Sequence, residues 1–182
     1  MLKSILILLT GFSLLSFTLQ TQPNGAVQKT TYTQASPQFK AQLTALYKSS
    51  LHLKEALISS DAKKAQQAAG GVKKALTQVD KTLLKDKAYA EWMSYQNLLN
   101  SSLDKIESEN KLKSQRKYFA QFNDALYKSV KAFGIEETVY YQHCPMALDG
   151  QGAYWLSDSK QIRNPYLGDN MLTCGSTKEA LK

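Results

Sequence analysis

Cysteine, proline and glycine are scarce in this chain of 182 residues, which contains two, four and nine of them respectively. These counts exclude a collagen, a disulfide-rich knot and a fully disordered chain. Long apolar runs are also lacking. Residues 4–19 form one, and no later segment approaches the roughly 20 residues that a membrane-spanning helix needs. What remains, with 43% hydrophobic and 21% charged residues, is typical of a folded protein of one domain.

Histidine and arginine are also rare, with two of each in the chain. Their scarcity counts against two classes of function, acid–base catalysis and nucleic-acid binding. Two histidines leave little for acid–base catalysis, and the common motifs of metalloproteases, serine hydrolases and dinucleotide-binding enzymes are missing. We therefore expect a protein that is not an enzyme. The net charge of +8 comes mainly from lysines, which alternate with acids from Lys29 to Lys182. This pattern predicts a solvated exterior and no nucleic-acid partner, because nucleic-acid-binding faces gather arginine and aromatic residues.

The apolar run at the start of the chain has the order of a secretory signal peptide. Lys3 precedes it, and polar residues follow from Thr18 to Thr21. We predict a signal peptide over residues 1–19 and export across the inner membrane. No small-residue cleavage site stands out, so an uncleaved leader that holds the chain to the membrane is the alternative. Residues 20–36 are polar and turn-prone, which indicates a flexible linker.

Residues 37–134 show helical spacing throughout. Apolar side chains recur every three or four residues in four segments: 37–58, 62–83, 87–109 and 111–133. Ser36 before Pro37 is a good helix start, and Gly134 is a good helix end. Gly70 and Gly71 in the second segment predict a kink or a close backbone crossing. We predict an all-α fold, an antiparallel up-down four-helix bundle.

The helical spacing stops at Gly134, and residues 135–182 form a different kind of segment, here called the tail. Its first part, Thr138 to Gln142, is β-prone, and the remainder is rich in turn residues. Fewer than about 50 residues bury too little surface to be stable alone. We therefore predict a turn-rich, partly β tail that packs on the bundle, so that residues 37–182 form a single domain.

Both cysteines lie in the tail, and each has a methionine two or three positions away. Thiolate and thioether sulfur favour Cu(I) over hard cations. This chemistry indicates a soft-metal site with five candidate ligands: His143, Cys144, Met146, Met171 and Cys174. His143 and Cys144 would point to opposite faces of an extended strand, which counts against both holding one ion. Zinc would require four ligands, including His143 and a carboxylate, so Cu(I) is the better candidate.

A disulfide between Cys144 and Cys174 is the alternative, because export exposes thiols to an oxidising compartment. Closing a loop of about 30 residues would stabilise the tail by ~3.6 kcal/mol in the loop-entropy model. Met146 and Met171 would then pack against the aromatic rings of the tail. No Cys-x-x-Cys motif is present, which counts against a redox-active thiol. This hypothesis describes an interaction or scaffold module with three aromatic recognition residues: Tyr154, Trp155 and Tyr166.

The tail motifs resemble those of a bacterial periplasmic family of domains of unknown function. The resemblance lies in four runs: His143 to Ala147, Gly152 to Ser157, Ile162 to Tyr166, and Met171 to Gly175. Members of that family occur alone behind a signal peptide or attached to adaptor subunits of heavy-metal efflux pumps. The resemblance therefore implies a periplasmic, free-standing relative with partners among efflux components. It also implies copper or silver handling by the cysteines and methionines named above.

Overall fold

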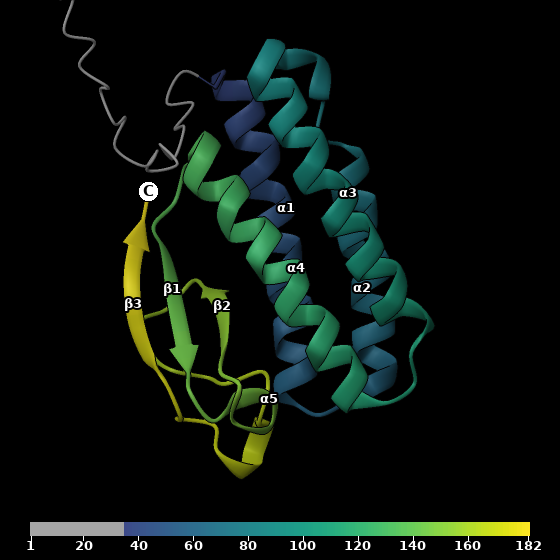
Figure 1. Ribbon diagram of the computed structural model, residues 1–182, viewed down its shortest axis with the longest axis vertical. Helices are drawn as coiled ribbons and strands as arrows, with labels where there is room; N and C mark the ends of the chain where they lie inside the picture. Colours follow the sequence, from purple (N-terminus) through teal and green to yellow (C-terminus); the bar gives the residue numbers. More distant parts are fainter. Residues whose placement is uncertain (1–34) are drawn as a thin grey trace, which may run out of the picture.

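The computed structural model describes residues 35–182, so the predicted signal peptide and most of the predicted linker lie outside this range. Four long helices come first: α1 (Pro37–Ile58), α2 (Ala62–Thr77), α3 (Asp86–Ser108) and α4 (Leu112–Phe133). Three strands follow: β1 (Val139–Cys144), β2 (Ala153–Ser157) and β3 (Ser176–Leu181). There are also three short helical segments: η1 (Lys81–Leu83), α5 (Ala147–Gly150) and η2 (Gly168–Asn170). The helices lie side by side, with the sheet against one flank of the bundle (Figure 1), which confirms the predicted fold class.

Local signals set the helix ends. The Ser36 hydroxyl accepts a hydrogen bond from the Phe39 N–H at 3.2 Å, and Gly134 ends α4 with a φ of 80°. The predicted second segment was too long, because α2 ends at Thr77. Its extension is blocked where Asp80 donates its backbone N–H to the side chain of Gln42 at 2.9 Å. A continued helix would use that N–H for the carbonyl four residues earlier.

Side chains from all four helices form the core of the bundle. At one end, the rings of Phe39, Trp92 and Phe133 meet with centroids 5.1–6.1 Å apart. All three side chains are fully buried, as the helical spacing predicts. α2 runs through Gly70 without a break, and a Cβ there would lie 3.2 Å from the Glu107 carboxylate on α3. The predicted kink is therefore absent at Gly70, and the close neighbour there is a side chain of α3 and not its backbone.

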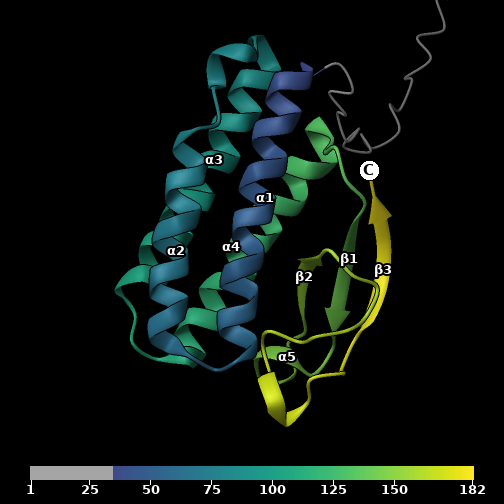
Figure 2. The same ribbon diagram turned by 180° about the vertical axis from the view of Figure 1, so that it is seen from behind.

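The tail forms an antiparallel sheet with the strand order β2-β1-β3. Figure 2 shows the sheet from behind, with β2 nearest the bundle. The outer edge of β2 faces α4, where the buried Asn123 accepts a hydrogen bond from the Leu156 N–H at 3.1 Å. This contact satisfies a backbone group that an edge strand would otherwise leave unpaired. Within residues 35–182, no helix has both the length and the apolar composition to cross a membrane.

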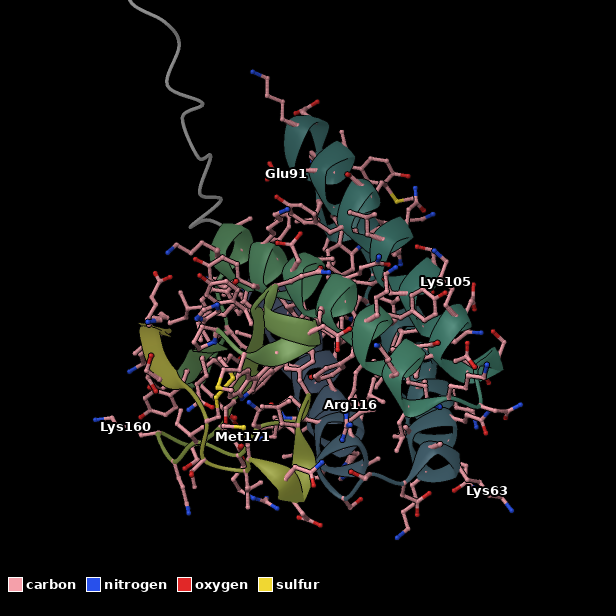
Figure 3. All side chains as sticks on the ribbon, turned by 60° about the horizontal axis from the view of Figure 1, so that its bottom comes forward. Lys63, Glu91, Lys105, Arg116, Lys160 and Met171 are labelled. Carbon is pink, nitrogen blue, oxygen red and sulfur yellow. A yellow bond between two sulfur atoms is a disulfide. The ribbon has the colours of Figure 1, made fainter. Side chains whose placement is uncertain are left out.

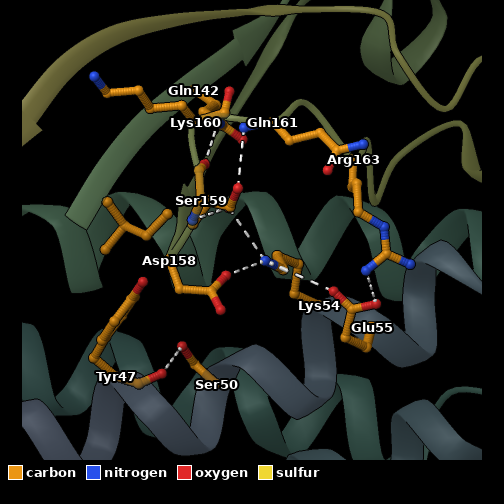
Figure 4. Close-up of polar contacts among 12 residues, drawn as sticks. Tyr47, Ser50, Lys54, Glu55, Gln142, Asp158, Ser159, Lys160, Gln161 and Arg163 are labelled. Atoms are coloured by element: carbon orange, nitrogen blue, oxygen red, sulfur yellow. Dashed lines mark hydrogen bonds and ion pairs between the residues drawn. The ribbon is translucent and has the colours of Figure 1, made fainter. Parts of the chain in front are cut away.

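A buried lysine joins the tail to α1. At the end of β2, Lys54 pairs with Asp158 at 3.0 Å and donates to the Ser157 hydroxyl at 3.2 Å (Figure 4). Beside it, Arg163 and Glu55 form an ion pair at 2.5 Å between the tail and α1. The expectation that the lysines form a solvated exterior is wrong for Lys54, whose charge is buried against its partners. The tertiary fold supplies these partners from residues about 100 positions away.

Candidate functional site

A disulfide links the two cysteines of the tail. Cys144 is fully buried at the end of β1, and its Cα lies 5.8 Å from that of Cys174. The yellow bond in Figure 3 marks this pair. Gly175 follows directly with a φ of 141°, and a Cβ there would lie 2.9 Å from the backbone oxygen of His143 and from the Trp155 ring. Glycine therefore permits the close approach that brings Cys174 to Cys144.

The disulfide removes the two thiolates on which the predicted soft-metal site depends. Cys144 and Cys174 present no thiolate while they are bonded, so two of the five predicted ligands are not available in this state. His143 lies on the opposite face of β1 from Cys144, as strand geometry predicts, and its ring packs against the Tyr154 ring at 4.2 Å with a tilt of 37°. The described range holds no group of three or more His, Cys, Asp or Glu side chains suited to a metal ion. With the disulfide formed, the soft-metal prediction therefore has no support from the geometry.

The two methionines beside the cysteines are exposed, and their packing against the aromatic rings of the tail stays a prediction. Met146 is 53% exposed and Met171 is 40% exposed. The place beside Trp155 is taken by Tyr166, whose ring meets it edge-on at 6.0 Å. Both thioethers therefore lie on the surface, near opposite ends of the disulfide loop.

Of the three predicted recognition residues, two are buried. Trp155 is fully buried, and Tyr166 packs against Phe119 at 5.8 Å while its hydroxyl donates to the Tyr154 carbonyl at 2.5 Å. These two residues support the sheet from within, so their assignment to a surface is wrong. Tyr154 remains, with 41% of its side chain exposed. The alternation of β2 explains the difference, because neighbouring strand residues point to opposite faces.

A row of packed rings joins α4 to one face of the sheet, here called the aromatic row: Tyr127, Tyr141, Tyr154 and His143. Tyr154 is exposed, and the other three rings are half-buried. Tyr127 on α4 stacks on Tyr141 of β1 at 3.8 Å, and Tyr141 stacks on Tyr154 of β2 at 4.7 Å. Sequence reasoning missed this row. The alternation of Tyr141 and His143 in a β-prone run was an available signal, but nothing local indicated that Tyr127 would join them.

Polar contacts hold one end of the aromatic row. The Tyr127 hydroxyl donates to Glu179 of β3 at 2.8 Å, and Lys131 pairs with the same carboxylate. Burial, followed by nearby negative charges, raises the pKa of Tyr141. Burial and the charge of Lys178 lower the pKa of His143. Both shifts favour uncharged rings at neutral pH, so the row offers flat, uncharged faces with a fixed spacing.

The turn between β1 and β2 is conformationally unusual. Leu148 and Asp149 both adopt left-handed backbone angles, with φ of 54° and 59°. For residues with a Cβ this conformation costs about 1–2 kcal/mol each. The following Gly150 and Gly152 also have positive φ, which glycine adopts without this cost. The surrounding fold therefore maintains a strained turn beside the sheet, a feature that is common at binding sites.

A family model described as a protein of unknown function (DUF3347) matches residues 46–138, just over half of the chain. The chain belongs to the DUF3347 family. In this DUF3347 protein the match runs from the middle of α1 to the residue before β1, so it covers most of the bundle and not the tail motifs. No curated protein and no solved structure matches the chain. The family description names no activity, and the periplasmic location and the link to efflux adaptors stay predictions.

Proposed function

We propose that this DUF3347 protein is an exported, non-enzymatic interaction module that binds a partner protein through its aromatic row. The observation that carries the proposal is a row of three stacked tyrosine rings with the tilted His143 ring beside them, drawn from one helix and two strands, with Tyr154 exposed. The chain has a net charge of +8. The expected partner surface is therefore a flat apolar patch flanked by carboxylates.

The construction of the face favours binding. Stacked rings have already lost most of their rotational freedom, so a partner does not have to order them. The disulfide ties β1 to the segment that leads into β3, which keeps the sheet in one geometry. Tyrosine is also among the residues that contribute most to binding energy at protein interfaces. The row is therefore preorganised for a partner.

Site-specific photocrosslinking in the host organism tests this proposal. A photoreactive phenylalanine analogue would replace Tyr154 in one variant and the similarly exposed Tyr89, on α3, in a control. We expect a discrete adduct from position 154 and none from position 89. Substituting Ala for Cys144 and Cys174 should weaken the adduct, because the face then loses its staple. Equal labelling from positions 154 and 89, or no adduct from 154, would contradict the proposal.

Soft-metal binding by the reduced protein is a second candidate function, supported by the exposure of Met146 and Met171. Both methionine side chains are accessible from solvent, and the cysteine Cα atoms, 5.8 Å apart, would bring two thiolates together after reduction. Two or three sulfur ligands suit Cu(I). In that case the predicted partners are components of a metal efflux system.

A Cu(I) titration of the reduced protein against a competing chelator tests the second candidate. We expect one equivalent to bind, with a clear loss of affinity in Met171→Leu and no binding in Cys174→Ser. The exposed Leu98→Met variant, which adds a thioether on α3, is the control and should bind no additional ion. A reduced protein that fails to compete with the chelator would rule out this function.

A further inference from the structure

A cleft lies between the first turns of α4 and two loops of the tail. Its volume is about 510 Å³, within the range typical of small-molecule sites. The helix contributes Lys113, Arg116 and Lys117, and the tail contributes the strained turn at Leu148 together with Tyr166 and Leu167. The end of the molecule that carries this cleft comes forward in Figure 3, where Arg116 is labelled.

Arg116 is held firmly at this cleft without a balancing charge. Its Nε donates to the Pro165 carbonyl at 2.9 Å, and its Nη2 donates to the Leu57 carbonyl at 3.0 Å and to the Ser60 hydroxyl at 2.9 Å. All three acceptors are uncharged. In the part of the chain that the structure describes, no carboxylate pairs with this guanidinium, so its positive charge is left for a ligand.

The backbone around Arg116 is built for close contact. Gly168 has a φ of 58°, and a Cβ there would lie 2.7 Å from the Ser60 hydroxyl and 3.0 Å from the Arg116 Nη2. A larger residue would therefore push the tail loop away from the guanidinium. The position of Arg116 is thus fixed jointly by α1, α4 and the tail.

The other charges at the cleft are also mainly positive. Lys113 pairs with Asp149 at 2.8 Å, and both side chains are exposed, so the pair is weak and Lys113 can change partner. Lys117 is exposed and forms no ion pair among the described residues. Three cations therefore face a single carboxylate. The Leu148, Leu167 and Tyr166 side chains add an apolar wall beside them.

We infer that this cleft binds a small organic anion, a carboxylate or phosphate group joined to an apolar or aromatic body. The cations would hold the anionic group, and the apolar wall would cover the body of the ligand. The inference does not depend on the aromatic row, because none of the residues of that row lines the cleft.

Calorimetric titration of the whole protein with benzoate and with phenyl phosphate tests this inference, with benzyl alcohol as the uncharged comparison. Binding of both anions is expected, and their relative affinities distinguish a carboxylate from a phosphate ligand. Lys117→Gln should weaken binding about three- to tenfold, since it removes one charge–charge contact. Lys63→Gln, an exposed lysine on α2, should leave the affinity unchanged.

Asp149→Asn provides a test of opposite sign. It removes the one carboxylate of the cleft while asparagine tolerates the left-handed backbone at this position, so binding should become several-fold tighter. Unfolding curves would show that each variant remains folded. Three results would overturn the inference: no binding of either anion at millimolar concentration, equally tight binding of benzyl alcohol, or equal weakening by Lys63→Gln and Lys117→Gln.

Discussion

The bundle and the tail are stabilised by different means. The bundle buries a continuous apolar core in which Phe39, Trp92 and Phe133 are fully enclosed by neighbouring helices. The tail has a three-stranded sheet with one long loop. Its buried residues, such as Trp155 and Tyr166, join the same apolar core, and a disulfide and the buried polar contacts of Lys54 add to this attachment. A helix can bury one stripe against its neighbours, whereas a small sheet with little core of its own also gains stability from a staple. The bundle therefore supports the tail.

Trp92→Ala should have the largest effect, because it opens a cavity in the bundle on which the tail depends. A buried Trp replaced by Ala costs about 3–5 kcal/mol of unfolding free energy. Denaturant unfolding, followed by circular dichroism, would measure the loss. Leu98→Ala on the exposed side of the same helix is the control and should change stability by no more than ~0.5 kcal/mol. A loss below ~1 kcal/mol for Trp92→Ala would show that the bundle core around Trp92 contributes little to the stability of the protein.

Removing the disulfide by Cys144→Ala with Cys174→Ala should affect the tail selectively. The loop spans a sequence separation of 30 residues. Its closure is worth up to ~3.6 kcal/mol in the loop-entropy model. Hydrogen exchange should become faster in β1 and β3 and remain slow in α2 and α3. Met171→Leu, next to the disulfide, is the control and should leave exchange unchanged. Equal acceleration in all helices would mean that the two regions unfold as one unit.

Lys54→Met should loosen the attachment between the regions. The variant keeps most of the side-chain volume but removes the charged donor that Asp158 and Ser157 share, at a cost of about 1–3 kcal/mol. Lys48→Met is a matched control on the same helix, since Lys48 forms an exposed ion pair with Glu137. Exposed pairs contribute about 0–1 kcal/mol. Denaturant midpoints compare the two, and an equal effect would argue against a special role for Lys54.

Acid should slightly weaken the attachment that Lys54 makes between the tail and the bundle. Burial raises the pKa of Asp158, but the hydrogen bond and charge of Lys54 outweigh it and hold the pKa below its ordinary value. The ion pair therefore stabilises the fold above the unfolded-state pKa, and this contribution disappears as the pH falls through the lower folded-state pKa. Asp158 is more than half exposed, so the change should stay below ~1 kcal/mol.

Unfolding curves between pH 7 and pH 2 measure this dependence. Asp158→Asn should be less stable at neutral pH and should lose less stability on acidification than the unchanged protein. Asp104→Asn, which alters an exposed ion pair to Lys73 within the bundle, is the control. If Asp158→Asn had the same acid dependence as the unchanged protein, the pair with Lys54 would carry no part of it.

Sequence reasoning succeeded where the deciding contacts are local. Ser36 and Gly134 mark the ends of helices because a cap contacts residues only three or four positions away. The β-prone run before Cys144 likewise became β1. Reasoning failed where the deciding contact is distant. Trp155 and Tyr166 have the composition of a recognition surface, but their mutual packing buries both.

The sequence by itself determined four amphipathic helices, a tail of another character and the presence of both cysteines in that tail. It left a disulfide and a metal site open, because a spacing of 30 residues is compatible with both. Only the tertiary structure decided that β1 and the segment before β3 lie close enough to pair Cys144 with Cys174. It also decided that Tyr127 joins the aromatic row. The physical reason is that helix periodicity is a local property, whereas strand pairing and burial depend on residues far apart in the chain.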